Sequence, residues 1–210
     1  MVLTVCVEKY IPTNAYFMVD GATRHAFLID PGAEGAKLLA VAKKEGLTIE
    51  KILLTHGHFD HIGAVEEIRR ELDIPVCMEE HGLDYVTHPG HNGSAFTPEP
   101  IKLTEVQFLP DGSDIALESG ACPLRLIATP GHTLDSCIYY SAQEKLAFAG
   151  DTIFAASYGR TDLYGGSEEA IIKNIKEKIL TLPPETALLC GHEAATTVEA
   201  ERNREWYRWG

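Results

Sequence analysis

This sequence lacks the features of several protein classes, and the first of these is positive charge. Lysine and arginine number 18 against 31 aspartates and glutamates, giving a net charge of −13. Because an acidic surface repels phosphate groups, we expect no nucleic-acid partner. No stretch approaches the ~18 apolar residues that a membrane-spanning helix needs, so no membrane association is expected. The first ten residues also lack the basic and apolar regions of a secretory signal, which predicts a cytoplasmic protein.

Paired cysteines are absent as well. The five cysteines are scattered, odd in number and never arranged as C-x-x-C, and most of them lie in apolar runs. This usage is typical of reduced, buried thiols, so neither a disulfide framework nor a thiolate metal site is expected. Any metal site in this chain has to be built from histidine and carboxylate side chains.

The length and the apolar pattern predict one folded domain over residues 1–210, with 45% hydrophobic residues available for its core. The predicted strands are Val2–Val7, Tyr16–Val19, Ala26–Ile29, Lys51–Leu54, Pro75–Met78, Gln107–Leu109, Asp114–Leu117, Leu124–Ala128, Cys137–Ser141, Leu146–Ala149 and Ala187–Cys190. The predicted helices are Glu34–Glu45, His61–Leu72, one beginning after Ser167, and Thr197–Tyr207. Two halves, each rich in strands and then helical, predict an α/β fold of two packed sheets with helices outside.

The most informative segment is His56-Gly57-His58-Phe59-Asp60-His61, between a predicted buried strand and an amphipathic helix. It holds four side chains that bind metals within six residues. His56 and His58 are two positions apart, so in an extended segment they face the same side. Without a cation, so many polar groups packed together would leave buried atoms unsatisfied. The segment therefore predicts a metal site.

Three later residues stand in the same kind of position. His132, Asp151 and His192 each follow an apolar run directly and begin a turn. Because strand ends at one edge of a sheet converge in space, we expect these side chains to meet the first segment. Histidine and aspartate suit zinc, iron and manganese, so we expect divalent cations, with zinc first and iron or manganese as alternatives.

This set of residues resembles the metallo-β-lactamase superfamily, and the likeness runs from Tyr16 to about Arg202. The resemblance implies an αβ/βα four-layer sandwich of two mixed sheets with the metal site at one edge. It also implies the ligands, namely His56, His58 and His132 for the first metal, Asp60, His61 and His192 for the second, and Asp151 bridging both.

Two aspartates receive further roles. Asp60 could orient the metal-bridging hydroxide or take its proton, which makes it the predicted catalytic side chain. Asp30, in the segment Leu28-Ile29-Asp30-Pro31-Gly32, has two readings. It either fixes a metal-bound histidine from behind or only forms an Asp-Pro-Gly turn.

The segment from Gly150 to Leu163 resembles the glyoxalase II branch, which hydrolyses S-acylglutathione-type thioesters, and also the iron-dependent persulfide dioxygenases. The sequence after Cys190 is most similar to short bacterial glyoxalase II-like proteins. Only 18 residues follow His192, so the helical glutathione-binding domain of typical glyoxalase II is not expected. Arg160 and Tyr158 are the candidate substrate-binding residues. The alternative for Arg160 is an ion pair with Asp162.

The predicted activity is hydrolysis of a small-molecule thioester, because a thiolate leaves without much help from a general acid. The first alternative is a persulfide dioxygenase with one iron held by His56, His132 and Asp151. A lactonase or other ester hydrolase of the same fold is the second alternative. A metal-binding module without activity is disfavoured because all seven ligands are retained. A homo-oligomer is compatible with the sequence.

Overall fold

The computed structural model describes residues 1–204 and contains two six-stranded mixed sheets. The first sheet holds β1 (Val2–Val7), β2 (Thr13–Val19), β3 (His25–Ile29), β4 (Thr48–Leu53), β5 (Val76–Glu79) and β6 (Val106–Leu109), in that spatial order. The second holds β7 (Asp114–Ile115), β8 (Leu124–Ala128), β9 (Cys137–Ser141), β10 (Leu146–Gly150), β11 (Ala187–Cys190) and β12 (Thr196–Thr197). Each half of the chain therefore builds its own sheet.

Successive side chains of each strand point to opposite faces of its sheet, so one apolar face of each sheet packs against the other sheet. In β2, Phe17 points to the outer face of the first sheet, whereas Tyr16 and Met18 point to the second sheet. The inter-sheet core also contains Phe27 from β3 and Phe148 from β10. This period of two is the pattern expected of strands that are buried on both faces.

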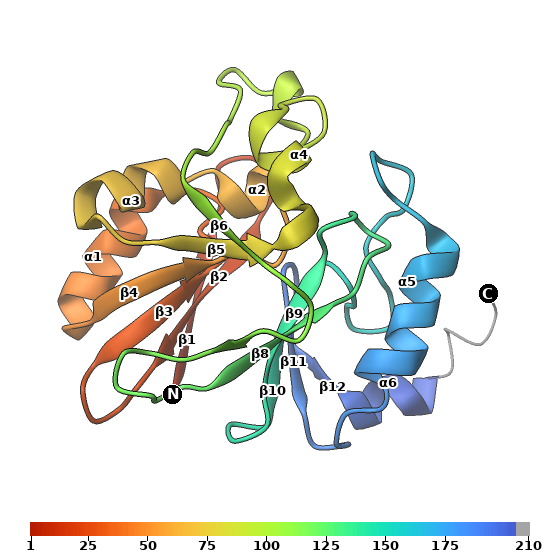
Figure 1. Ribbon diagram of the computed structural model, residues 1–210. Helices are drawn as coiled ribbons and strands as arrows, with labels where there is room; N and C mark the ends of the chain where they lie inside the picture. Colours follow the sequence, from red (N-terminus) through yellow and green to blue (C-terminus); the bar gives the residue numbers. More distant parts are fainter. Residues whose placement is uncertain (205–210) are drawn as a thin grey trace.

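Helices cover the outer faces of both sheets (Figure 1). On the first sheet these are α1 (Gly35–Glu45) and α3 (Val65–Leu72), and on the second α5 (Glu168–Asn174), its π-helical continuation (Ile175–Ile179) and α6 (Val198–Arg204). Shorter helical segments are α2 (Phe59–Ile62), α4 (Leu83–Thr87), and the 3₁₀ turns Glu80–Gly82 and Ser94–Phe96. The layers confirm the predicted four-layer sandwich.

The predicted helix His61–Leu72 is wrong in one respect, because the structure divides it into α2 and α3. The turn at Pro31 and Gly32 packs against the break. The Ala64 amide donates to the Pro31 carbonyl at 2.9 Å, and a Cβ at Gly63 would lie 2.2 Å from the Gly32 carbonyl oxygen. A contact with a distant segment thus replaces the helical hydrogen bonds at this point.

The other predicted strands and helices are present, although several begin or end at different residues. The short strand β12 was not predicted. The predicted last helix, Thr197–Tyr207, corresponds to α6, and its residues 205–207 lie outside the described residues. Within residues 1–204, no helix combines the length and the apolar character needed to cross a bilayer.

Candidate metal centre

The seven histidines and aspartates singled out in the sequence lie together beside the ends of strands from both sheets. Four of them follow β4, and the others follow β8, β10 and β11. All are buried except His192, which is partly exposed. A cavity of about 270 Å³ opens onto His58, Asp60, His132, Asp151 and His192.

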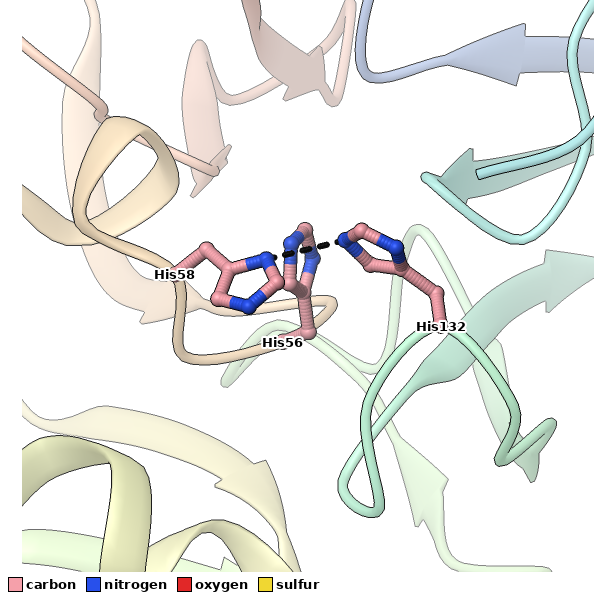
Figure 2. A group of neighbouring side chains, drawn as sticks. All are labelled: His56, His58 and His132. Atoms are coloured by element: carbon pink, nitrogen blue, oxygen red, sulfur yellow. Dashed lines mark hydrogen bonds between the residues drawn. The ribbon is translucent and has the colours of Figure 1, made fainter. Parts of the chain in front are cut away.

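The first group contains His56, His58 and His132, whose ligand atoms lie within 4.8 Å of one another. Figure 2 shows the three rings pointing toward one another from two separate loops. His58 Nδ1 lies 2.9 Å from His132 Nε2. Three nitrogen atoms at this separation can bind one cation between them.

The second group contains Asp60, His61 and His192, again within 4.8 Å. Asp151 lies between the two groups. Its Oδ2 is 3.2 Å from His192 Nε2 and 3.5 Å from His132 Nε2, and its Oδ1 is 3.4 Å from His61 Nε2. One carboxylate therefore faces both sets of histidines, which is the position that a bridging ligand needs.

Three of the histidines are oriented by hydrogen bonds to their Nδ1 atoms. The Nδ1 atoms of His132 and His192 donate to the carbonyls of Arg160 and Pro12, each at 2.7 Å. His61 Nδ1 lies 3.0 Å from the Asp30 carboxylate. Because carbonyls and carboxylates only accept hydrogen bonds, Nδ1 carries the proton in each ring, and Nε2 is left facing the centre.

Asp30 is thus placed against His61, and it makes more contacts than a simple turn would require. Its carboxylate accepts from the Thr55 amide at 2.8 Å and from the Thr55 hydroxyl at 2.7 Å. These bonds fix the residue that precedes His56. Asp30 therefore supports both the start of the metal-binding segment and one of its rings.

Buried polar atoms without a hydrogen-bond partner give independent support for a cation site here. His56 Nε2, His61 Nε2 and Asp151 Oδ1 are buried polar atoms without a hydrogen-bond partner. Such atoms are rare in folded proteins because each costs free energy. The ligand atoms of these three residues lie within 4.8 Å of one another, so cations bound at this place would supply a partner for all three.

The charge state of the centre also suits cations. Burial and the neighbouring histidines lower the pKa of His56 well below its usual value, and burial lowers that of His58 to about 3. Burial opposes protonation of His61, but the Asp151 and Asp30 carboxylates raise its pKa well above the usual value. His56 and His58 are therefore ready to bind a cation, whereas His61 has to lose a proton to do so.

The loop after β10 brings a backbone carbonyl to His132. Gly159 donates its amide to the Asp151 carbonyl at 3.0 Å. A Cβ at Gly159 would lie 2.2 Å from that same oxygen and 2.8 Å from His132 Nδ1. Only glycine allows the backbone at residue 159 to come this close to Asp151 and His132. This close contact gives a physical reason for a glycine within the segment from Gly150 to Leu163.

The two candidate substrate-binding residues lie in different places. Arg160 lines the cavity, and its guanidinium makes the predicted ion pair with Asp162, at 2.7 and 2.8 Å. Tyr158 packs against α5 instead, where its hydroxyl donates to Glu168 at 2.7 Å. The structure thus brings Arg160, but not Tyr158, to the cavity.

Sequence reasoning missed several residues of the site. Phe59 and Phe154 line the cavity, and the only signal for Phe59 was an apolar residue inside a polar motif. Asp135 was also overlooked. It is fully buried, and its carboxylate would lie 3.2 Å from a Cβ at Gly57, inside the metal-binding segment. Burial raises its pKa to about 7.

Comparison with known proteins identifies the family to which this fold and this site belong. The family model described as "Metallo-beta-lactamase superfamily" matches residues 10–192. "Probable metallo-hydrolase YqgX" of Bacillus subtilis is 39% identical over 92% of this chain and 91% of its own length. "Hydroxyacylglutathione hydrolase GloC" of Haemophilus influenzae is 29% identical over 85% of each chain.

Two solved structures have the same fold and comparable length. BLEG-1 B3 metallo-beta-lactamase superposes with a TM-score of 0.90 at 35% identity, covering 97% of each chain. TTHA1623 in a di-iron-bound form superposes with a TM-score of 0.83 at 32% identity, covering 96% of this chain and 98% of its own. With its two packed sheets and its His/Asp cluster, the chain belongs to the metallo-beta-lactamase superfamily, as a metallo-hydrolase of that family.

Proposed function

We propose that the chain hydrolyses thioesters with two divalent cations, zinc first and iron or manganese as alternatives. His56, His58 and His132 would hold one cation, Asp60, His61 and His192 the other, and Asp151 both. The observation that carries this proposal is the position of Asp151, whose two oxygens face histidines of both groups. When bound, such a pair of cations supplies an activated water and polarises the substrate carbonyl.

The side chains of this protein have distinct tasks around that chemistry. Asp60 Oδ2 lies 3.3 Å from His192 Nε2 and lines the cavity, so it can orient the attacking water and accept its proton. The Arg160–Asp162 ion pair uses two of the guanidinium's five N–H groups. The other N–H groups can bind a substrate carboxylate at the cavity wall. Phe59 and Phe154 give part of the cavity wall an apolar surface.

A thioester suits this site better than an amide. Water adds to the carbonyl carbon, the carbon–sulfur bond breaks, and the thiolate leaves with the electron pair and is protonated afterwards. An amide nitrogen instead needs a proton before it leaves. Apart from the proposed metal ligands, the only cationic side chain that lines the cavity among the described residues is Arg160, which does not titrate near neutral pH. The relative named hydroxyacylglutathione hydrolase supports the same reaction class.

The test combines metal analysis with two assays of the purified protein. We expect about two cations per chain and release of free thiol from S-lactoylglutathione. Asp151→Ala should remove activity together with one or both cations. The control is Asp114→Ala, an exposed aspartate paired with Arg125, which should leave both unchanged.

The persulfide dioxygenase predicts a different result. It would bind about one iron per chain, consume oxygen with glutathione persulfide and release no thiol from a thioester. That combination would overturn the proposal. An Asp151→Ala variant with the wild-type rate would refute the bridging role of this residue.

A further inference from the structure

A second cavity of about 410 Å³ adjoins the metal cavity. The two cavities share Phe59, Gly93, Arg160 and Leu163 as lining residues, so they lie side by side and together are called the cleft below. The remaining lining residues of the second cavity are mostly aromatic or apolar. Arg160, at the boundary with the metal cavity, is the only residue with a permanent charge among the described residues that line it.

Exposed apolar side chains are concentrated at this cleft. Five of the nine large apolar residues that are exposed within residues 1–204 line one of the two cavities, and these are Tyr10, Ile11, Phe96, Leu163 and Tyr164. Phe96 is 93% exposed at the rim. Apolar surface gathered at one place, with polar groups around it, is typical of a binding site.

The walls of the second cavity are built before any ligand binds. Asn92 is fully buried, and its side chain donates to the carbonyls of Tyr85 and Ile101 at 2.8 and 3.1 Å. The backbone carbonyl of Asn92 accepts a hydrogen bond from the Phe59 amide at 2.9 Å. These bonds tie the segment that carries Phe96 to the metal-binding segment.

Contacts also hold other aromatic side chains that line the second cavity. Tyr164 stacks on His91 with ring centroids 3.6 Å apart, and its carbonyl accepts from the Tyr85 hydroxyl at 2.9 Å. Phe59 makes an edge contact with Tyr10 at 5.7 Å. A prearranged apolar wall costs little entropy when a ligand binds.

We propose that this cavity binds the acyl group of the substrate and that the preferred substrates are thioesters of bulky apolar acids. The proposal rests on the proposed hydrolase function. Small thiol carriers such as glutathione have charges and amide groups, which lose hydration when they enter an apolar cavity. The acyl group is the part of a thioester that can be wholly apolar. With its carbonyl at the metal cavity, it extends past Phe59 into the second cavity.

Binding of the product acid tests this independently of catalysis. Straight-chain carboxylates from acetate to octanoate are titrated calorimetrically into the metal-loaded protein. A methylene that is fully buried strengthens binding about fourfold, and about twofold to fourfold is expected here because the cavity is open on one side. The same dissociation constant from acetate to octanoate would overturn the proposal.

Variants identify the surface that is responsible. Phe96→Ala should flatten the dependence on chain length, because it removes apolar area at the rim. The matched control is Leu72→Ala, an exposed apolar residue at the end of α3, which should keep the wild-type dependence. If both variants flatten it equally, the effect does not come from the cavity.

Kinetics separate this proposal from the hydrolase function. Thioesters of the neutral thiol N-acetylcysteamine, with acyl chains of two to eight carbons, are assayed by thiol release. We expect kcat/KM to rise with chain length by a similar factor per methylene. Thiol release without that rise leaves the hydrolase intact and overturns the acyl subsite. Tighter binding of longer carboxylates without thiol release does the opposite.

Discussion

Replacing Gly159 by alanine should weaken metal binding although residue 159 binds no metal. The new methyl group would lie 2.2 Å from the Asp151 carbonyl oxygen and 2.8 Å from His132 Nδ1. Since non-bonded heavy atoms need about 3.5 Å, the loop has to retreat by roughly 1 Å. That movement breaks the 3.0 Å bond from the Gly159 amide and draws the Arg160 carbonyl away from His132.

The size of the effect follows from the role of that carbonyl. Loss of a group that orients a metal-bound histidine typically reduces affinity by about 10- to 100-fold, or about 1.4–2.7 kcal/mol. The assay is competition for zinc with a chromophoric chelator, after circular dichroism has shown that the variant is folded. Gly21→Ala is the control, because a Cβ there meets nothing within 4 Å, and its zinc affinity should stay within twofold. A folded Gly159→Ala protein that matches the wild type would refute the reasoning.

Three further outcomes are expected. Burial raises the pKa of Asp135 from 3.8 to about 7, so the native state binds more protons than the unfolded state and stability falls as pH rises between those values. Between pH 5 and pH 8 this fall is about 2.7 kcal/mol, because pH 5 lies about two units below the folded-state pKa; Asp135→Asn should remove it in urea titrations, and equal pH dependence in both proteins would contradict it. Burial opposes protonation of His192, but bonds to Asp151 and Asp60 raise its pKa to about 10, so zinc must displace its proton. Zinc affinity should therefore drop from pH 8 to pH 6 with measurable proton release, and a pH-independent affinity would exclude this. Ser167→Ala removes the hydroxyl that accepts from the Ala170 amide at the start of α5, and should cost about 1 kcal/mol in urea; an unchanged midpoint would show that the cap contributes nothing.

Much of the fold could be predicted because buried strands leave a clear signal. Leu124–Ala128, Cys137–Ser141 and Ala187–Cys190 are short apolar runs between turn residues, and the structure has strands with these same ends. The break between α2 and α3 gave no comparable signal. It depends on the Pro31 carbonyl, about thirty positions earlier in the chain, which a periodic pattern cannot reveal.

The site divides in the same way. The histidines and aspartates were found because chemically distinctive side chains are crowded into one segment and follow strand ends. The groups behind His132 and His192 are backbone carbonyls, of Arg160 and Pro12, and a carbonyl is present at every residue whatever its side chain. The apolar cavity was missed because its lining comes from four segments that are distant in sequence, two of which contribute one residue each, Tyr10 and Phe59.

The division of the site between the two sheets has a consequence for how the protein comes apart. His56, His58, Asp60 and His61 follow strand β4 of the first sheet, whereas His132, Asp151 and His192 follow strands of the second. Cations held by both sets would link the two halves, in addition to the apolar core between the sheets and to hydrogen bonds such as the one from the Tyr16 hydroxyl to the Cys190 carbonyl. Separation of the sheets would then require release of the cations, so we expect metal in solution to raise the free energy of unfolding by mass action. By the same coupling, we expect a substitution in the core between the sheets, far from any ligand, to weaken metal binding.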